Sequence, residues 1–405
     1  MGILSPIKKE IKLISWILKN KKKTINMEFK KKSILIVDCW IPEFDKDSGS
    51  RRMYKIIQSL VESNYKVFLV SDQHEYKYND EYVHYYEELG VTVYRPYLKG
   101  IIPVTLNRFL REITSKIDDA ILSRPDVFKK YYPILKNISP KVNIIYDMVD
   151  FHYIRNLREY ELNNSIFALQ QAEHYKTLEK ENCELADITF VVSETDKILL
   201  KENNFKCKKI CIVSNIHDSK EIDKNYKPFE KRKDLLFIGG FQHTPNIDAV
   251  NYLCDKVLPL ILEKDPSIKL HIVGSNTPNK IKEKANKNII IHGYAQYLDS
   301  YFNDCKVFVA PLRFGAGIKG KIGQSLEYNL PLVTTDIGAE GFNFDPYSEL
   351  MIANNSIEIS NNVLELYFNP EKWKNISIHS KTILEPFSYT KTKENILKSL
   401  ATKLD

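Results

Sequence analysis

The sequence predicts an α/β protein with two Rossmann-like, doubly wound parallel-sheet domains that face each other across a cleft. At 405 residues the chain is too long for one compact core. From residue 33 onward, short β-rich runs alternate with amphipathic helical patterns, which is typical of βαβ units. A polar, charge-rich stretch over residues 214–233 interrupts this alternation, as an interdomain linker does. We therefore expect a basic extension (1–32), a first domain (33–218), a second domain (219–390) and a C-terminal helix (391–405) that packs back on the first domain.

The expected strands are short apolar runs bounded by turn residues. In the first half they are Ser33–Asp38, Tyr65–Val70, Val91–Tyr94, Val142–Tyr146 and Ile188–Val192. In the second half they are Asp234–Gly239, Ile268–Gly274, Ile289–Gly293, Val307–Pro311 and Leu330–Thr335. Amphipathic helices are expected around Met53–Val61 and Val250–Leu262. Ligands of such sheets lie beyond the carboxyl ends of the strands, so the loops at these ends are expected to line the cleft.

The charge of the chain is unevenly distributed. The formal net charge is +7, with 43% hydrophobic and 27% charged residues, which describes an ordinary globular protein. Residues 1–32 carry ten lysines and two glutamates, so the basic excess belongs to this segment and the rest of the chain is close to neutral.

The basic N-terminal segment is neither a signal peptide nor a membrane span. Its longest apolar run, Leu13–Leu18, is far shorter than the roughly 20 residues that cross a bilayer. Its apolar residues recur at helical spacing between lysines, so it can lie on an anionic membrane surface. A disordered or protein-docked arm is an equally good reading. We expect a cytoplasmic protein, with peripheral binding to the inner face of the plasma membrane as one of these two alternatives.

The six cysteines are scattered along the chain without a Cys-x-x-Cys pair. Without a secretory signal they are expected to be reduced structural thiols, and no metal site is expected.

The segment over residues 310–335 is the most informative part of the sequence. An apolar strand is followed by a glycine-rich turn that carries Arg313, Lys319 and Lys321, then by an amphipathic helix. Glycines let backbone N–H groups approach an anion, the helix N-terminus adds partial positive charge, and lysine adds a full one. This pattern predicts a phosphate site. The alternative is an ordinary turn with solvated lysines.

Several motifs, in order, resemble retaining glycosyltransferases of the GT-B fold, family-4-like. They are Val213–Ile216, Gly239–Asn246, Leu270–Gly274, Gly293 before an aromatic-rich helix, and Gly315–Lys321 (Gly-Ala-Gly-Ile-Lys-Gly-Lys, which looks like a recognised subgroup). The resemblance covers about residues 33–390. It implies a nucleotide-diphospho-sugar donor bound mainly by the second domain, an acceptor bound mainly by the first, and net retention.

The resemblance also assigns donor-binding residues in the second domain. Those expected to contact the donor are Gly240, His243, Tyr294, Arg313, Gly315, Gly317, Lys319 and Gln324, with Lys319 also stabilising the departing diphosphate. Tyr294 is equally compatible with a core tyrosine. Many relatives carry two glutamates where this chain has Ala316 and Gln324, which leaves sugar recognition open. Glu327 is out of register with them and is expected to be structural or solvated.

In the first domain, ionisable residues follow the strand that ends at Tyr146. By resemblance, His152 faces the donor sugar and positions the reacting groups. Asp150 is expected to orient His152 or to accept a proton from the acceptor, and a helix N-cap is its alternative role. Gly49, at the entry of a helix, resembles the flexible glycine loop near the diphosphate. Asp147 and Asp150 do not form an Asp-x-Asp metal motif, so no metal or cofactor is expected.

The sequence thus predicts a metal-independent glycosyltransferase that adds one sugar to a surface glycan, a lipid-linked precursor or a glycoprotein. Two alternatives remain, a nucleotide-sugar 2-epimerase of the same fold and a non-catalytic subunit that binds a nucleotide sugar. No interaction with nucleic acid is expected. The donor base, the sugar and the acceptor cannot be read from the sequence.

Overall fold

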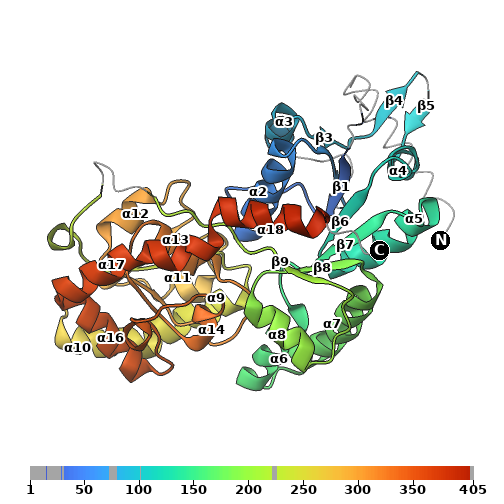
Figure 1. Cartoon of the computed structure of the whole chain (residues 1–405). Helices are drawn as coiled ribbons and strands as arrows, with labels where there is room; N and C mark the ends of the chain where they lie inside the picture. Colours follow the sequence, from blue (N-terminus) through green and yellow to red (C-terminus); the bar gives the residue numbers. More distant parts are fainter. Residues whose placement is uncertain are drawn as a thin grey trace.

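The chain folds into two α/β units, each built around its own parallel sheet (Figure 1). The computed structural model describes residues 15, 29, 32–72, 80–100, 102–220 and 226–401. Most of the basic extension predicted over 1–32, including its proposed membrane-binding helix, lies outside the described residues, as do 221–225 of the predicted linker and the terminal 402–405. The predicted fold class is confirmed.

The first unit contains a seven-stranded sheet with the order β3-β2-β1-β6-β7-β8-β9, in which all neighbours are parallel. Its strands are β1 (Ser33–Asp38), β2 (Lys66–Ser71), β3 (Thr92–Val93), β6 (Asp119–Ser123), β7 (Asn143–Asp147), β8 (Ile188–Val191) and β9 (Ile210–Ile212). A separate antiparallel pair is formed by β4 (Tyr97–Lys99) and β5 (Ile102–Val104). The helices are α2 (Ser48–Glu62), α3 (Asp80–Glu88), α4 (Leu106–Thr114), α5 (Pro125–Ile138), α6 (His152–Asn163), α7 (Ile166–Leu185) and α8 (Glu194–Glu202).

Two strands of this sheet, β6 and β9, are missing from the sequence prediction, and β6 lies at the centre of the sheet between β1 and β7. Only three apolar residues, Ala120–Leu122, separate its polar ends. Such a short run gives little β signal, and the strand forms because β1 and β7 pair with both of its edges.

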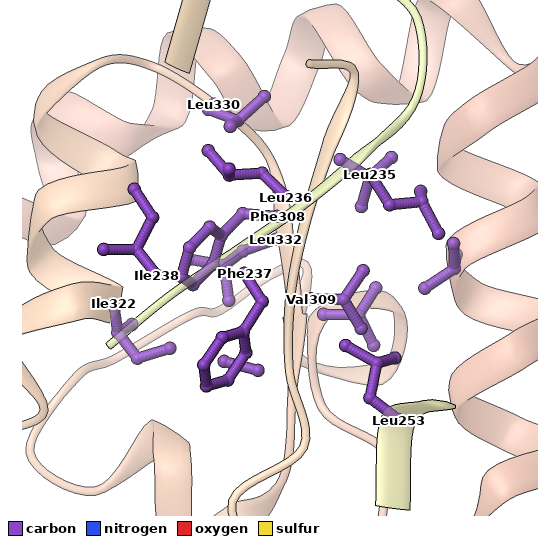
Figure 2. Close-up of a cluster of buried hydrophobic side chains, with 14 of the residues drawn as sticks. Leu235, Leu236, Phe237, Ile238, Leu253, Phe308, Val309, Ile322, Leu330 and Leu332 are labelled. Atoms are coloured by element: carbon purple, nitrogen blue, oxygen red, sulfur yellow. The ribbon is translucent and has the colours of Figure 1, made fainter. Parts of the chain in front are cut away.

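The second unit contains a five-stranded parallel sheet with the order β12-β11-β10-β13-β14. Its strands are β10 (Leu235–Ile238), β11 (Leu270–Val273), β12 (Ile289–Gly293), β13 (Val307–Ala310) and β14 (Leu332–Thr334). Its helices are η1 (Phe229–Lys231), α9 (Thr244–Tyr252), η2 (Leu253–Val257), α10 (Leu258–Lys264), α11 (Asn279–Lys282), α12 (Asp299–Asp304), α13 (Gly320–Glu327), α14 (Asp336–Ala339), α15 (Ser348–Met351), α16 (Ser356–Phe368), α17 (Pro370–Leu384) and η3 (Glu385–Phe387). Figure 2 shows its core, where Leu236 and Phe237 of β10 lie among side chains of β13, β14 and α13.

The helix predicted around Val250–Leu262 is interrupted by a π-helical turn, η2, between α9 and α10. Pro259 explains the interruption. Proline has no N–H to donate, and its ring would clash with the carbonyl four residues earlier in a regular α-helix. The wider π turn removes this clash.

The last helix, α18 (Tyr389–Ala401), follows the second unit but packs on α2 and β9 of the first (Figure 1). Ile396 and Leu400 are buried in the core of the first unit. The Tyr389 hydroxyl donates to Glu62 Oε2 at 2.8 Å, and Lys393 Nζ lies 2.7 Å from the same oxygen. The two units are therefore joined both by residues 213–234 and by this returning helix.

A buried ion pair fixes α2 on the first sheet. The Arg52 guanidinium donates to both carboxylate oxygens of Asp147 at 2.8 and 2.9 Å, and its Nε donates to the Val213 carbonyl at 2.9 Å. Both side chains are at most 1% exposed. Because Asp147 is the last residue of β7, this pair holds the N-terminal half of α2 over the carboxyl edge of the sheet.

We expect Arg52→Ala to destabilise the first unit by about 3–5 kcal/mol, because the Asp147 carboxylate would be left buried without a counter-charge. Urea unfolding followed by circular dichroism measures this loss. Lys55→Ala, on the same helix, is the control and should cost less than about 1 kcal/mol. Equal midpoints for the two variants would contradict the role given to Arg52.

Candidate active site

A cavity of about 260 Å³ lies between the two units. The first unit contributes the turn before α2 and the start of that helix, and the connecting segment contributes residues 215–217. The second unit contributes the end of β10, the turn that enters α9, and one face of α13. The cavity therefore lies at the carboxyl edge of both sheets, where ligands of doubly wound proteins bind.

Two helix N-termini meet at this cavity. α2 begins at Ser48, with Asp47 as its N-cap, and α13 begins at Gly320. A Cβ atom added to Gly320 would lie only 2.5 Å from the Ser48 Cβ, so the helices approach this closely only because residue 320 is glycine. A helix N-terminus carries N–H groups without intrahelical acceptors and partial positive charge, which favours an anion in the space beside it, and at α2 the Asp47 carboxylate accepts one of these N–H groups, from Ser50, at 2.8 Å.

Lys321 adds a full charge to the cavity. Its Nζ donates to Asn246 Oδ1 and lies 4.6 Å from the centre of the Phe237 ring. Within the described part of the chain, no carboxylate forms an ion pair with it. Burial, together with the charge of Lys319, lowers the pKa of Lys321 to about 7. A bound anion would favour the protonated form, so this lysine is suited to hold a phosphate group.

Lys319, which the sequence placed on the diphosphate, is held elsewhere. Its Nζ donates to the Gly317 carbonyl at 2.6 Å and to Glu340 Oε2 at 3.0 Å, and it does not line the cavity. Burial lowers the pKa of Lys319, and the Glu340 charge opposes this effect. Arg158 of α6 binds the other Glu340 oxygen at 2.6 Å and the Gly315 carbonyl at 2.7 Å. Lys319 therefore belongs to a clamp that joins the glycine turn to the first unit.

The glycine turn itself lies against the first unit. Gly315 and Gly317 have φ angles of +142° and +64°, which residues with a side chain rarely adopt. A Cβ on Gly317 would lie 3.2 Å from Val192 and 3.9 Å from Asp150 Oδ1. The predicted neighbourhood of this turn and the loop after β7 is thus present in the structure.

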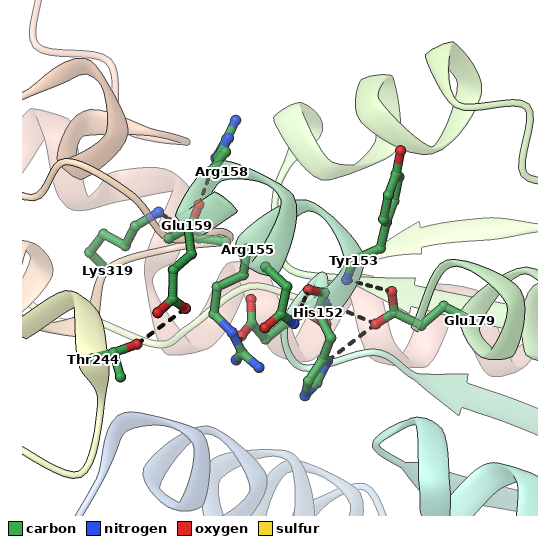
Figure 3. Close-up of polar contacts among 12 residues, drawn as sticks. His152, Tyr153, Arg155, Arg158, Glu159, Glu179, Thr244 and Lys319 are labelled. Carbon is green, nitrogen blue, oxygen red and sulfur yellow. Dashed lines mark hydrogen bonds and ion pairs between the residues drawn. The ribbon is translucent and has the colours of Figure 1, made fainter. Parts of the chain in front are cut away.

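His152 is the first residue of α6, and Glu179 of α7 holds it (Figure 3). His152 Nδ1 lies 3.0 Å from the Asp150 carbonyl oxygen and 3.1 Å from Glu179 Oε1. Both are acceptors, so Nδ1 carries a proton, and in the neutral imidazole Nε2 is then the nitrogen that can accept a hydrogen bond. The Glu179 carboxylate also accepts the backbone N–H groups of His152 and Tyr153, at 2.9 and 3.0 Å.

The carboxylate of Asp150 has a different role from the one expected. Glu179 orients His152 and caps α6, whereas the Asp150 carboxylate pairs with Arg155 and has one buried oxygen without a hydrogen-bond partner. Burial raises the pKa of Asp150, but Arg155, His152 and Lys319 outweigh this and hold it below its usual value. Asp150 is therefore ionised beside the glycine turn.

Backbone strain is present next to His152. Val149 has a φ of +62°, and the Asp150 N–H donates to the Met148 carbonyl at 2.6 Å, which closes a tight γ-turn. A β-branched residue in this conformation is strained, and such strain is concentrated at functional sites. The Val149 side chain lies toward Gly49, 3.7 Å from where a Cβ would be.

The structure brings several of the other predicted residues to the cavity. Gly240, His243 and Gln324 line it, and burial lowers the pKa of His243, with Arg155 and Lys321 adding to the effect. Gly49 lies in the first turn of α2, behind the lining residue Ser48. The N-cap of α9 is His243.

Tyr294 is at the rim of the cavity and is 54% exposed, which excludes a core position. Its hydroxyl accepts a hydrogen bond from Nζ of Lys46, a lining residue from the first unit, at 3.0 Å.

Arg313 does not reach the cavity. Its Nε donates to Asp248 Oδ2 at 2.9 Å, its Nη2 donates to the other oxygen, and its guanidinium lies over the Tyr252 ring at 4.8 Å. In this arrangement the charge of Arg313 is paired with Asp248 of α9, and its contact with the diphosphate stays a prediction.

Glu327 is structural and not solvated. It is buried and accepts two hydrogen bonds from Arg51, at 2.8 and 3.1 Å, and it lies 2.8 Å from His217 Nδ1. This contact joins α13 to α2 and to the connecting segment. Sequence reasoning missed Arg51, Glu179 and Glu340 as partners because each lies far along the chain from the residue that it holds.

Among the residues that the structure describes, no helix is long and apolar enough to span a bilayer. The same residues also contain no group of three or more His, Cys, Asp and Glu side chains that could hold a metal ion.

Comparisons with known proteins agree with this geometry. Residues 232–369 match the family model described as glycosyl transferases group 1. A curated relative, an uncharacterized 44.6 kDa protein in the cps region of Klebsiella pneumoniae, is 26% identical over 162 residues. That match covers 38% of this chain and 42% of the relative, so the chain matches less than half of the relative's length.

Solved structures share the whole fold. TarM matches with a TM-score of 0.71 and 13% identity, covering 92% of this chain and 99% of TarM. Sucrose-phosphate synthase from Thermosynechococcus elongatus gives 0.67 and 12%, covering 92% and 98%. HepE from Anabaena, solved in complex with UDP and glucose, gives 0.62 and 11%, covering 91% and 99%. The chain therefore has the GT-B fold of these structures, and residues 232–369 of its second unit match the glycosyl transferases group 1 model.

Proposed function

We propose that the protein transfers a sugar from a nucleotide-diphospho-sugar to an acceptor hydroxyl, with retention and without a metal ion. The observation that carries this proposal is the pair of helix N-termini that meet at Ser48 and Gly320 beside the buried Lys321. Together they supply N–H donors and positive charge, which a bound metal ion would otherwise have to provide to a diphosphate.

The nucleoside would lie at the rim formed by Gln324, Leu298 and Tyr294. A glutamine amide can hydrogen-bond a ribose hydroxyl, and an exposed tyrosine ring can stack on a base. HepE was solved with UDP and glucose, and a TarM variant from S. aureus with UDP, α-GlcNAc-glycerol and fondaparinux. These complexes support the proposal that the donor here is a nucleoside-diphospho-sugar and the acceptor a glycan.

The chemistry follows from the charges at the cleft. As the bond between the sugar and the diphosphate breaks, negative charge grows on the leaving oxygen, where the helix N-termini and Lys321 stabilise it. The acceptor hydroxyl attacks the same face of the sugar and gives its proton to the leaving diphosphate. His152 Nε2 would accept a hydrogen bond from a sugar hydroxyl and so hold the ring in place.

We also propose a biological setting. The curated relative lies in a cps region, which fits a role in surface glycan synthesis. Lipid-linked and protein acceptors remain compatible with the site. Cytoplasmic location, and binding of the basic N-terminal segment to an anionic membrane, complete the proposal.

A thermal-shift screen across UDP, GDP, dTDP and CMP tests donor binding, because a ligand stabilises the folded state in proportion to the logarithm of its concentration over Kd. We expect a nucleoside diphosphate to give the largest shift. Shifts no larger for diphosphates than for CMP would contradict a diphosphate site.

We expect His152→Ala to lower sugar transfer and donor hydrolysis at least about 100-fold while the Kd of the nucleoside diphosphate changes little, because His152 acts on the sugar. Release of the nucleoside diphosphate, followed with a coupled assay, gives both rates. His84→Ala, on the exposed face of α3, is the matched control. Turnover that is absent in the unaltered protein would favour a non-catalytic subunit, and interconversion of the donor sugar without transfer would favour an epimerase.

Donor binding should also take up a proton. With a pKa of about 7, Lys321 is mostly neutral at pH 8, and a bound diphosphate requires its charged form. Calorimetry at pH 8 in buffers of different ionisation enthalpy should show an uptake close to one proton, and affinity should fall as pH rises above 7. Lys321→Met should abolish the uptake and weaken binding about 10- to 100-fold, whereas Lys282→Met on α11 should change neither. Uptake that persists in Lys321→Met would assign the proton to another group.

A further inference from the structure

We propose that Trp40 is the platform for the acceptor, and that the acceptor group bound there is an uncharged sugar ring. This inference rests on the proposed function, because it concerns the second substrate of the same reaction. The contacts around Trp40 determine its position, and the charges around it determine what it can bind.

Trp40 follows β1 by two residues and is 39% exposed, unusually high for a tryptophan at the carboxyl edge of a sheet. Its indole N–H donates to Ser50 Oγ at 3.4 Å, and the Arg124 guanidinium lies 4.6 Å from the ring centre. Ser50 is in the first turn of α2, next to the cavity-lining Ser48. The ring is therefore held on two sides, beside the donor cavity, with part of its surface open.

Two described cations at this edge of the first sheet are each paired with a carboxylate. Arg124 Nε donates to Asp38 Oδ1 at 3.1 Å, and Lys130 pairs with Asp72. The Asp72 N–H donates to the carbonyl of Asp38, two residues before Trp40, at 2.8 Å, so the backbones of β2 and β1 place Asp72 at the same edge of the sheet as Trp40. A phosphate placed here would meet paired cations and nearby carboxylates, so this edge does not favour an anionic acceptor.

An uncharged sugar fits the same surroundings. One face of a pyranose ring is lined by C–H groups, which pack well on an aromatic ring, while its hydroxyls need polar partners. The Asp72 side chain is 24% exposed and can accept a hydroxyl hydrogen bond. The donor cavity differs from this edge because its cation is not neutralised: Lys321 forms no ion pair with a described carboxylate.

The test compares two kinds of acceptor with the full-length protein and its donor. Octyl glycosides of several hexoses represent uncharged sugars, and glycerol 3-phosphate and ribitol 5-phosphate represent phosphorylated acceptors. We expect transfer to at least one glycoside, with a KM that rises about tenfold in Trp40→Ala and less in Trp40→Phe, which keeps an aromatic ring. Phe368→Ala, which removes another exposed aromatic ring, from α16, should leave this KM unchanged.

Two further measurements separate this inference from the proposed function. The Kd of the nucleoside diphosphate, from calorimetry, should change less than twofold in Trp40→Ala, and its melting temperature should match that of Trp40→Phe. A protein that fails to bind or hydrolyse any donor would refute the proposed function itself. A protein that hydrolyses its donor but transfers only to the phosphorylated acceptors or to no glycoside would overturn the Trp40 assignment, as would an unchanged glycoside KM in Trp40→Ala.

Discussion

The cleft depends on how closely α2 and α13 approach each other. Ser48 and Gly320 are in such tight contact that a Cβ on residue 320 could not be accommodated without movement. One turn further along α13, a Cβ on Gly323 would lie 2.4 Å from the His217 ring. Glycine at these two positions lets one helix lie against both the first unit and the connecting segment. The Arg51–Glu327 and Arg158–Glu340 pairs then hold the two units at this distance.

Because α2 and α13 lie so close together, two lysines at the start of α13 have different environments. Lys319 contacts Glu340 and does not line the cavity, whereas Lys321, two residues further along the chain, lines it. Lys319 pairs with Glu340, which also binds Arg158 of the first unit. The charge of Lys319 therefore helps to hold the glycine turn against the first unit. Lys321 has an amide and an aromatic ring as neighbours, neither of which neutralises a charge. Burial without neutralisation is what makes it sensitive to an arriving anion.

Local patterns in the sequence were sufficient to predict the fold class and most strands. Runs such as Ile34–Val37 are buried on both faces and therefore continuously apolar, so they indicate a strand without knowledge of the neighbouring elements. They were insufficient for β6, whose short apolar run is a strand only between β1 and β7. The same distinction applies to the site. The glycine–lysine turn and His152 stand out locally, whereas Glu179 and Glu340 gain their roles from contacts across the fold. The partner of Arg313 could not be predicted either, because a cation in this loop can pair with a neighbouring helix, here with Asp248 of α9.

The charges of the cleft also indicate which step the protein assists most. Where the two units meet, the N-termini of α2 and α13 and Lys321, which forms no ion pair with a described carboxylate, face the place where a leaving group would gain negative charge. On the first unit's side, the described cations Arg52, Arg124 and Lys130 are each paired with a carboxylate. A cation beside the attacking hydroxyl would lower its pKa and stabilise the alkoxide, but a hydroxyl that loses its proton late needs no such stabilisation. This asymmetry favours a reaction in which departure of the leaving group runs ahead of attack, and the leaving group itself takes the proton.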